Sequence, residues 1–369
     1  MRYLGIKTGG GAACAVALLV ILSGGFSSVA LAGSTFGNRA SWIEHAGEQI
    51  RNNFTQIDAI MWFNLDKERD WRIDFDPASV AAYRTSWTGI QKGAFLEDFP
   101  YPPPPDTTIV DNFETLVDVH QTRIGWYESL DKYYPAASID AVQARGSIPY
   151  IVLELFDAWE GDDARSGPSR LDDIIDHLTS KEGRYYDRMK SWADAAAANG
   201  LPIEITIGHE MNGDWFTWGY LNGHNGNTPE KFAEAYRLIV DLFRERDALN
   251  VDWVWTINAS WMDDFSEAFP GVDYVDRMGM NGFNWGERER DPNDPSQWQW
   301  DDWRDFEYIF GQWDPNNPDG VNNYLALVEL SDAPIIIGEF SAVPEPATMA
   351  LLAVGSAGLF LTRRRRSRG

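Results

Sequence analysis

Short apolar runs alternate with amphipathic stretches along most of this chain, and this alternation restricts its possible folds more than any other feature. Each run is bounded by turn-forming residues and reads as a buried strand. Alternating strand and helix units predict an α/β fold around a parallel sheet. The seven runs cover residues 93–96, 123–127, 148–155, 203–210, 251–258, 275–283 and 334–340.

Helix signals occupy the stretches between these runs. Thr228 is suited to cap a helix that begins at Pro229, and apolar residues then recur at helical spacing. A second helix over 184–200 ends at Asn199 and Gly200, a common C-terminal signal. The proline-rich segment 101–106 fits a stiff extended loop after the first of the seven strands.

Residues 38–92 supply what a seven-stranded barrel lacks. They read as a helix over 38–54, a strand over 57–66 and a helix over 76–87. A closed barrel of eight strands has no edges, whereas seven strands leave a gap. We therefore predict a (β/α)8 TIM barrel that is circularly permuted, so that helix 7, strand 8 and helix 8 come first. A fragment of a duplicated domain and an extra N-terminal cap are the alternatives.

Two acidic residues end strands of this predicted barrel. Glu210 closes the run 203–210 and Glu339 lies near the end of 334–340. The carboxyl ends of the strands form the face on which barrel enzymes carry their active sites. Retaining glycoside hydrolysis needs two facing carboxyl groups, of which one protonates the leaving oxygen and the other attacks the sugar. A salt-bridged structural acid is the alternative for each residue taken alone.

Aromatic residues accompany the acids. Trp62, Trp215, Trp218 and Trp285 lie at or just beyond predicted strand ends and offer flat apolar faces to sugar rings. Each could instead belong to the core, where most tryptophans near strand ends are found. The clustering of His, Glu, Asn and Trp within 209–218 favours a site over simple packing.

The segment "HEMNGDWFTW" resembles the acid/base motif of glycoside hydrolase family 26, typified by endo-β-1,4-mannanases. These are retaining barrel enzymes with the acid/base on strand four and the nucleophile on strand seven. The N-terminal segment resembles the part of the family that closes the barrel. The resemblance implies that Glu210 is the acid/base, Glu339 the nucleophile, His209 a sugar-contacting neighbour, Trp215 an aromatic wall and Trp62 the tryptophan under the sugar ring.

Two positions depart from the family pattern. Phe283 stands where the family usually has a Tyr hydrogen-bonded to the nucleophile, and Thr206 stands where an Arg is common. We expect Phe283 and Trp285 to line the substrate site. Glu154 and Asn258 end neighbouring strands and are suited either to line the cleft or to a structural role.

The predicted function is therefore retaining, endo-acting hydrolysis of a β-linked polysaccharide, with β-1,4-mannan as the expected substrate. Double displacement requires Glu210 to be protonated at the start, so its pKa should be raised by burial and by the neighbouring negative charge. A β-glucan or exopolysaccharide glycanase is the alternative among enzymes. A non-catalytic polysaccharide-binding surface protein is the alternative outside them.

Both ends of the chain resemble targeting segments. Residues 1–32 combine early basic residues, an apolar run and the small-residue site Ala30-Leu31-Ala32, the pattern of a secretory signal peptide. Pro344-Glu345-Pro346, an apolar stretch over 347–362 and a basic end resemble the PEP-CTERM sorting signal of exopolysaccharide-producing Gram-negative bacteria. We expect export to the cell surface or medium, with membrane contact through this segment before sorting. The expected domains are 1–32, 33–342 (with 33–92 as the closing unit) and 343–369.

The charge and the cysteine content exclude some classes of binding partner and of covalent cross-link. Between the two end segments the chain has 24 basic and 55 acidic residues, which disfavours nucleic acid and anionic membrane surfaces. The single cysteine, Cys14, lies in the expected signal peptide, so the mature chain would have no disulfide. We predict no cofactor and no metal, because the stretch 314–320 lacks the spacing of a calcium loop. No sequence feature assigns an oligomeric state.

Overall fold

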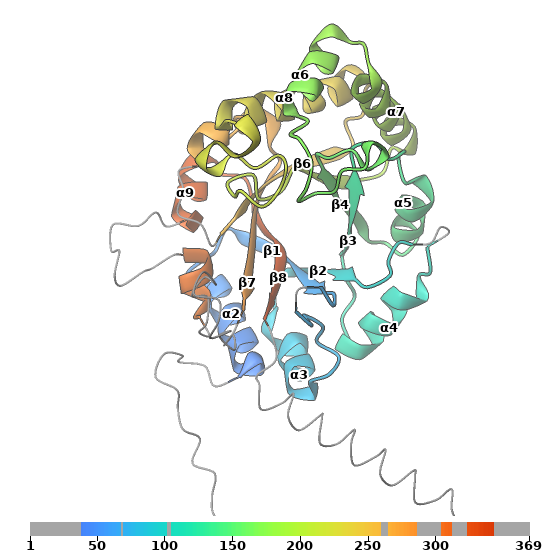
Figure 1. Ribbon diagram of the computed structural model, residues 1–369. Coiled ribbons are helices and arrows are strands. Elements are labelled where there is room, and N and C mark those ends of the chain that lie inside the picture. Colours follow the sequence, from blue (N-terminus) through green and yellow to red (C-terminus); the bar gives the residue numbers. More distant parts are fainter. Residues whose placement is uncertain are drawn as a thin grey trace, which may run out of the picture. The chain divides into compact units, whose positions relative to one another are not determined.

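Eight parallel strands close into a barrel in the order in which they occur in the chain (Figure 1). The computed structural model describes residues 38–67, 69–101, 105–259, 265–285, 304–311 and 323–342. All seven predicted strands and the closing strand are present. The strands are β1 (Ile57–Asn64), β2 (Gln91–Leu96), β3 (Arg123–Ser129), β4 (Ile148–Glu154), β5 (Ile203–Ile207), β6 (Val251–Asn258), β7 (Arg277–Asn284) and β8 (Ile335–Ala342).

Strand β1 closes the ring. It pairs in parallel with β2, where Trp62 lies opposite Ala94, and with β8, where Ile60 lies opposite Ile337. The prediction that residues 38–92 supply the eighth strand is confirmed. A barrel with this closure has no exposed edge strand.

Helices lie on the outside of the barrel (Figure 1). The predicted cap at Thr228 is present, because its side chain accepts from the Lys231 N–H; the Asp76 side chain caps α3 in the same way and accepts from the Ala78 N–H. The helices are α2 (Arg39–Asn52), α3 (Pro77–Ser86), α4 (Thr108–Val117), α5 (Ala136–Gln143), α6 (Leu171–Ser180), α7 (Arg184–Asn199), α8 (Pro229–Glu245) and α9 (Asn323–Leu330). Short helical turns are η1 (Ala158–Glu160), η2 (Leu221–Gly226), η3 (Ser266–Ala268), η4 (Val272–Tyr274) and η5 (Glu307–Gly311).

The predicted signal peptide and the predicted sorting segment lie outside the described residues. So does the stretch 314–320, which we considered for calcium. Within the described ranges, no helix has both the length and the apolar character to cross a membrane.

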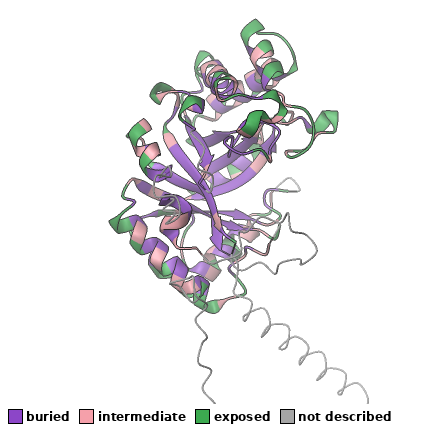
Figure 2. Cartoon of the chain, turned by 60° about the vertical axis from the view of Figure 1, so that its left-hand side comes forward, coloured by how far each residue is buried: buried purple, intermediate pink, exposed green. Residues whose placement is uncertain are grey.

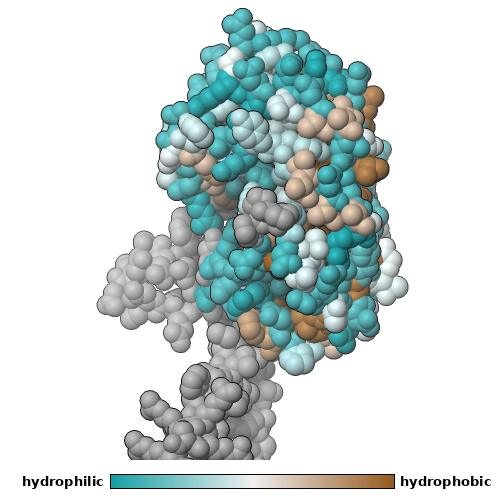
Figure 3. All heavy atoms as spheres, turned by 90° about the vertical axis from the view of Figure 1, so that its right-hand side faces the viewer, coloured by the Kyte–Doolittle hydropathy of each residue, from teal (hydrophilic) through white to brown (hydrophobic). Residues whose placement is uncertain are grey.

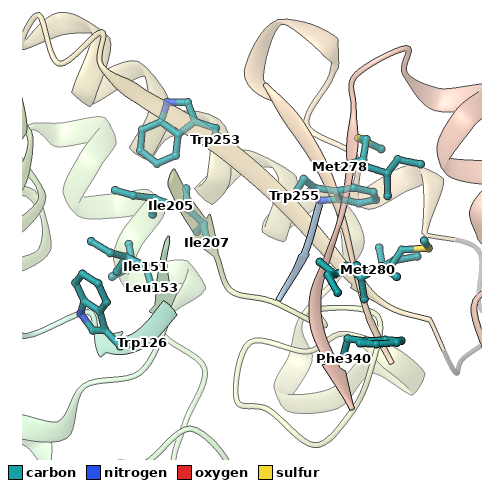
Figure 4. Close-up of a cluster of buried hydrophobic side chains, with 14 of the residues drawn as sticks. Trp126, Ile151, Leu153, Ile205, Ile207, Trp253, Trp255, Met278, Met280 and Phe340 are labelled. Carbon is teal, nitrogen blue, oxygen red and sulfur yellow. The ribbon is translucent and has the colours of Figure 1, made fainter. Parts of the chain in front are cut away.

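The main core lies between the strands and the helices. Alternate residues of each strand point outward and interdigitate, as Figure 4 illustrates for Ile151, Ile205, Trp255 and Met280. A smaller apolar cluster, which includes Met61, fills the inside of the barrel. The strands are therefore buried on both faces, whereas exposed residues lie on the outer sides of the helices and on loops (Figure 2). The side of the molecule that carries α4, α5 and α7 is mainly hydrophilic (Figure 3).

A charged layer fills the barrel near the N-terminal ends of the strands. The Arg123 guanidinium donates to Glu204 through Nε at 2.6 Å and Nη2 at 2.8 Å. Arg277 Nε lies 3.2 Å from Glu204 Oε1, and its Nη1 donates to Asp58 Oδ1 at 2.5 Å. These residues come from β1, β3, β5 and β7, and side chains of alternate strands commonly share one layer in such barrels. The opposite end of the barrel, at the carboxyl ends of the strands, is where the predicted acids lie.

Candidate active site

The carboxyl ends of the strands carry the predicted acids. Glu210 follows β5 and Glu339 lies in β8, and each is only 6% exposed. They come from strands on different sides of the closed ring, with β6 and β7 between them in one direction. Side chains from two distant parts of the chain thus meet at one end of the barrel.

Glu210 has an unusual backbone conformation. Strand β5 ends at Ile207, three residues earlier than predicted, because Gly208 and Glu210 adopt left-handed φ angles of +54° and +55°. The Glu210 N–H still donates to the Thr256 carbonyl at 2.9 Å, which ties the segment to β6. Left-handed backbone is costly for a residue other than Gly and is concentrated at functional sites.

A β-bulge orients Glu339. Met280 pairs with Ile337 and the next residue, Asn281, pairs with Glu339, so Gly338 is the extra residue in β8. Without the bulge, alternation would turn Glu339 outward; instead Phe340 points outward and Glu339 points into the barrel. A side chain at Gly338 would place its Cβ 2.7 Å from Asn281 Oδ1, which only glycine avoids.

The Glu339 carboxylate has two close polar neighbours. Tyr127 of β3 forms a side-chain hydrogen bond with it, and His209 Nε2 lies 3.7 Å from Oε1. Burial first, and the charge of Glu210 second, raise the pKa of Glu339 to about 8. The positive charge of Lys67 and the Tyr127 hydrogen bond oppose this shift.

Hydrogen-bonding side chains around the Glu210 carboxyl favour its ionised form. Trp215 Nε1 donates to Oε2 at 2.8 Å, and Asn258 contributes a side-chain hydrogen bond. The Asn212 side chain in turn bonds both backbone groups of Asn258, at 3.0 and 2.8 Å. Burial raises the pKa of Glu210, as predicted.

The two carboxyl groups titrate as a pair. Each is buried, and the charge of Glu210 is the second cause of the raised pKa of Glu339. Ionising both would leave two like charges in one poorly solvated site, so the charge of either carboxylate disfavours ionisation of the other. A site with one proton on two carboxyl groups can deliver an acid and a nucleophile in the same step.

His209 is a neutral ring in an aromatic pocket. Burial first, and the positive charges of Lys67 and Arg165 after it, lower its pKa to about 3. Its ring centroid lies 4.6 Å from that of Phe216 and 5.8 Å from that of Tyr127. The neutral imidazole therefore faces Glu339 without adding a positive charge.

Glu154, at the end of β4, is a third acid near the pair. Burial raises its pKa to about 7, and the charges of Lys67 and Arg165 partly oppose the shift. It also contributes to the raised pKa of Glu339. Of the two residues whose role the sequence left open, Asn258 binds Glu210, and Glu154 belongs to the electrostatic surroundings of the pair.

The prediction for Trp62 is wrong. Trp62 is fully buried outside the barrel, with its ring 5.6 Å from those of Tyr83 and Phe340. Met61 and Phe63 point inward, so strand alternation turns Trp62 toward the helices. It cannot lie under a sugar in the cleft.

Trp218 is fully buried too, against the expectation that it offers a face to sugars. Its ring stacks on Phe216 at 4.7 Å, and its Nε1 donates to the His209 carbonyl at 2.8 Å. It therefore supports the backbone of His209 from behind.

The other predicted aromatic residues lie near the mouth of the barrel. Trp215 and Phe283 are half-buried, and Trp285 is 36% exposed. Phe283 packs against Trp71 with ring centroids 4.9 Å apart, and Trp71 lies equally close to Trp285. The sequence analysis did not name Trp71, on the loop after β1, which is buried and packs against both of these rings.

Tyr127 and Lys67 were missed as well. Lys67 Nζ lies 4.5 Å from the centroid of the Tyr127 ring, and both residues act on Glu339. The position of Tyr127 at the end of the run 123–127 was the available signal, since polar groups at that point face the site. In the described residues, no group of three His, Cys, Asp or Glu side chains is arranged to hold a metal ion.

Comparison with known proteins finds similarity to a hydrolase family and to a sorting motif. Residues 157–293 match the profile of Glycosyl hydrolase family 26, and residues 342–366 match the PEP-CTERM protein-sorting motif. Endoglucanase H of Acetivibrio thermocellus is 30% identical over 245 residues, which cover 64% of this chain and 23% of that protein. A mannan endo-1,4-beta-mannosidase of Bacillus subtilis is 29% identical over 175 residues, 43% of this chain and 48% of that protein.

Among solved structures, a beta-mannanase from a symbiotic protist of the termite Reticulitermes speratus aligns with a TM-score of 0.48 and 16% identity, covering 81% of this chain and 78% of that one. This chain spans less than half the length of the two sequence relatives. Residues 157–293 are therefore similar to glycosyl hydrolase family 26, and residues 342–366 are similar to the PEP-CTERM protein-sorting motif.

Proposed function

We propose that this protein is a retaining, endo-acting glycoside hydrolase that cleaves a β-linked polysaccharide. One observation carries the proposal: two buried carboxyl groups, Glu210 and Glu339, interact at the carboxyl end of a closed barrel. The family 26 profile supports the same chemistry.

In the first step, the ionised Glu339 attacks the anomeric carbon of the bound sugar. The glycosidic bond breaks as Glu210 gives its proton to the leaving oxygen, and an ester joins the sugar to Glu339. The hydrogen bond from Tyr127 and the charge of Lys67 favour the ionised form of Glu339, which is the attacking form.

In the second step, Glu210 takes a proton from a water molecule. The water oxygen attacks the anomeric carbon, the ester bond breaks, and Glu339 leaves as a carboxylate. Two inversions give net retention of the anomeric configuration. Hydrogen bonds from Trp215 and Asn258 favour the ionised carboxylate of Glu210. The ionised carboxylate is the form that accepts the proton from water in this step.

Four residues are proposed to contact the sugar: His209, Trp215, Phe283 and Trp285. The proximity of His209 to Glu339 and the bond from Trp215 to Glu210 support contact at the reacting sugar. The partial exposure of Phe283 and Trp285 supports contact at the mouth of the barrel.

β-1,4-Mannan is the proposed substrate, on the similarity to mannan endo-1,4-beta-mannosidases. A β-glucan is the second candidate. It is favoured by the relative named Endoglucanase H, which matches 64% of the chain. Fold and carboxylates alone do not select the sugar.

The test is release of reducing sugar by the full chain from mannan, glucomannan and mixed-linkage β-glucan. Glu210→Gln and Glu339→Gln should each lose nearly all turnover and still bind oligosaccharide. If the wild type binds these polymers and releases no sugar, the protein is a non-catalytic binding protein. If either variant keeps wild-type turnover, the assignment of its carboxylate is wrong.

We further propose that the barrel is a circular permutation of the family order. In this chain Glu210 follows the fifth strand and Glu339 lies in the eighth, so each lies one strand later than the corresponding family position. The N-terminal strand β1 accounts for this difference. A chain in which residues 38–90, which end before β2, are moved to follow residue 342 should fold and keep its activity. Failure of that chain to fold would count against the permutation.

We also propose that the protein is exported from the cytoplasm. Residues 1–32 would act as a signal peptide, 33–342 as the catalytic barrel, and 343–369 as a sorting segment that contacts the membrane before processing. The PEP-CTERM motif over 342–366 supports this route. Fractionation of the native host should recover the barrel outside the cytoplasm, and recovery in the cytoplasm alone would contradict it.

A further inference from the structure

Exposed aromatic side chains are unevenly distributed over the described part of the chain. The large hydrophobic side chains that are exposed include five aromatic residues, and every one lies on a loop that follows a strand, at the end of the barrel that holds Glu210 and Glu339. Leu201, Leu249 and Val272, which are aliphatic, precede strands. The five aromatic residues are Phe75, Tyr101, Tyr133, Trp159 and Trp285.

Trp159 is the most exposed of the five, at 84%. It lies in the turn η1 after β4, five residues beyond Glu154. Five residues span at most about 18 Å, which limits the distance between the Trp159 and Glu154 backbones. Its ring stacks on no other ring in the described residues. A single exposed indole is ordinary, but the gathering of exposed aromatic residues at one end of the barrel is the kind of apolar surface that marks a binding site.

The turn that carries Trp159 is held firmly. The Asp157 carboxylate, 1% exposed, accepts from the Trp159 N–H at 3.1 Å, the Glu160 N–H at 3.2 Å and the Tyr185 hydroxyl at 3.0 Å, and forms a salt bridge with Arg184 Nη2 at 2.9 Å. A buried carboxylate with three hydrogen-bond donors and one salt bridge fixes the backbone that carries the exposed indole. Exposure of Trp159 is thus a feature of an ordered turn.

Tyr133, on the preceding loop, adds a second ring. It is 74% exposed, and the Arg188 guanidinium lies 3.6 Å from its ring centroid, which occupies one face and leaves the other. The two loops are joined, because the Ala158 N–H donates to Asp131 Oδ1 at 2.9 Å. Both loops also contact α7, where Arg184 and Arg188 are one helical turn apart.

We propose that Trp159 and Tyr133 form a second polysaccharide-binding site, outside the carboxylate cleft, which stacks on the pyranose rings of the same polymer chain. This inference rests on the proposed function for the identity of the polymer. A neutral sugar chain suits the site, because flat apolar rings bind the C–H faces of pyranoses and the neighbouring charges of Arg184 and Arg188 are already paired with Glu160 and Tyr133.

The experiment measures binding apart from hydrolysis. Affinity electrophoresis through gels containing glucomannan compares the full-length wild type with Trp159→Ala, Tyr133→Ala and Trp159→Tyr. Leu249→Ala, at a side chain 76% exposed on a segment that precedes β6, is the matched control. Loss of one stacking ring should weaken polymer binding by about three- to tenfold. Trp159→Tyr should retain most of the affinity, and the control should match the wild type.

Hydrolysis provides the second readout. For Trp159→Ala, kcat/KM on the polymer should fall by the same factor as the affinity, while kcat/KM on a short oligosaccharide stays unchanged. Unchanged polymer affinity in Trp159→Ala, or an equal fall on both substrates, overturns the second site. If no form of the protein hydrolyses the polymer yet Trp159→Ala still loses binding, the proposed activity fails and the second site stands.

Discussion

Removing the Tyr127 hydroxyl isolates its influence on Glu339. Tyr127 forms a side-chain hydrogen bond with the Glu339 carboxylate, and Lys67 Nζ lies 4.5 Å from the centroid of its ring. Tyr127→Phe keeps the ring and deletes only the hydroxyl. Phe283, where the family pattern has a Tyr, offers no hydroxyl in its place.

The size of the effect follows from the charge on the acceptor. A hydrogen bond to a charged group contributes about 1.5–3 kcal/mol, which corresponds to about one to two pKa units. The bond favours the ionised carboxylate, so its loss raises the pKa of Glu339. Because the first step needs ionised Glu339, the acid limb of kcat/KM against pH should move upward by about one to two units. At a pH below that limb, kcat/KM should fall by about 10- to 100-fold.

The assay is a pH profile of kcat/KM on a soluble substrate. Tyr101→Phe is the matched control, because it removes a hydroxyl that donates at 2.8 Å to a different buried acid, Glu128 of β3. Its profile should match that of the wild type. Adding Phe283→Tyr to Tyr127→Phe returns a hydroxyl from β7 and should move the acid limb part of the way back. An acid limb unchanged in Tyr127→Phe would refute the role of this bond.

Three further predictions concern the barrel that holds the pair. Gly338→Ala brings a Cβ 2.7 Å from Asn281 Oδ1 and 2.8 Å from Tyr150 Oη, so it should cost about 1–3 kcal/mol and lower activity by about 100-fold through displacement of Glu339, measured by thermal unfolding and kcat. Wild-type kcat would contradict the need for glycine in the bulge. Glu204→Gln removes the acid that two buried arginines share, and should cost about 3–5 kcal/mol in chemical denaturation with the carboxylate pair unaffected; a loss below 1 kcal/mol would contradict it. Glu339→Gln should be more stable than the wild type. The folded-state pKa of Glu339, about 8, exceeds its ordinary value of 4.5, so the wild type loses stability as the pH rises from 4.5 to 8. The Tm of Glu339→Gln should therefore exceed that of the wild type by an amount that grows over this range. A Tm difference independent of pH would argue against the raised pKa.

Much of the framework was predictable because it depends on local patterns. Runs of apolar residues with capped helices between them identified all eight strands, and barrel closure required β1 between β2 and β8. The two acids were predictable as residues at strand ends. These features follow from periodicity and topology, which the sequence records directly.

Side-chain direction was not predictable in the same way. The run that holds Trp62 is apolar on both faces, so it has no alternation from which to tell inward from outward residues. The bulge at Gly338 and the left-handed backbone at Glu210 break strand regularity for tertiary reasons. Tyr127 joins Glu339 only because β3 and β8 face the same interior, and no spacing along the chain encodes that contact.

Trapping the glycosyl-enzyme tests the central claim most directly. An aryl β-oligosaccharide with a good leaving group needs no acid in the first step, whereas the second step still needs Glu210 as base. In Glu210→Gln, intact-mass and peptide analysis should therefore find one sugar adduct per chain, bound as an ester to Glu339. No adduct, or an adduct on another residue, would contradict the assignment of these two carboxylates.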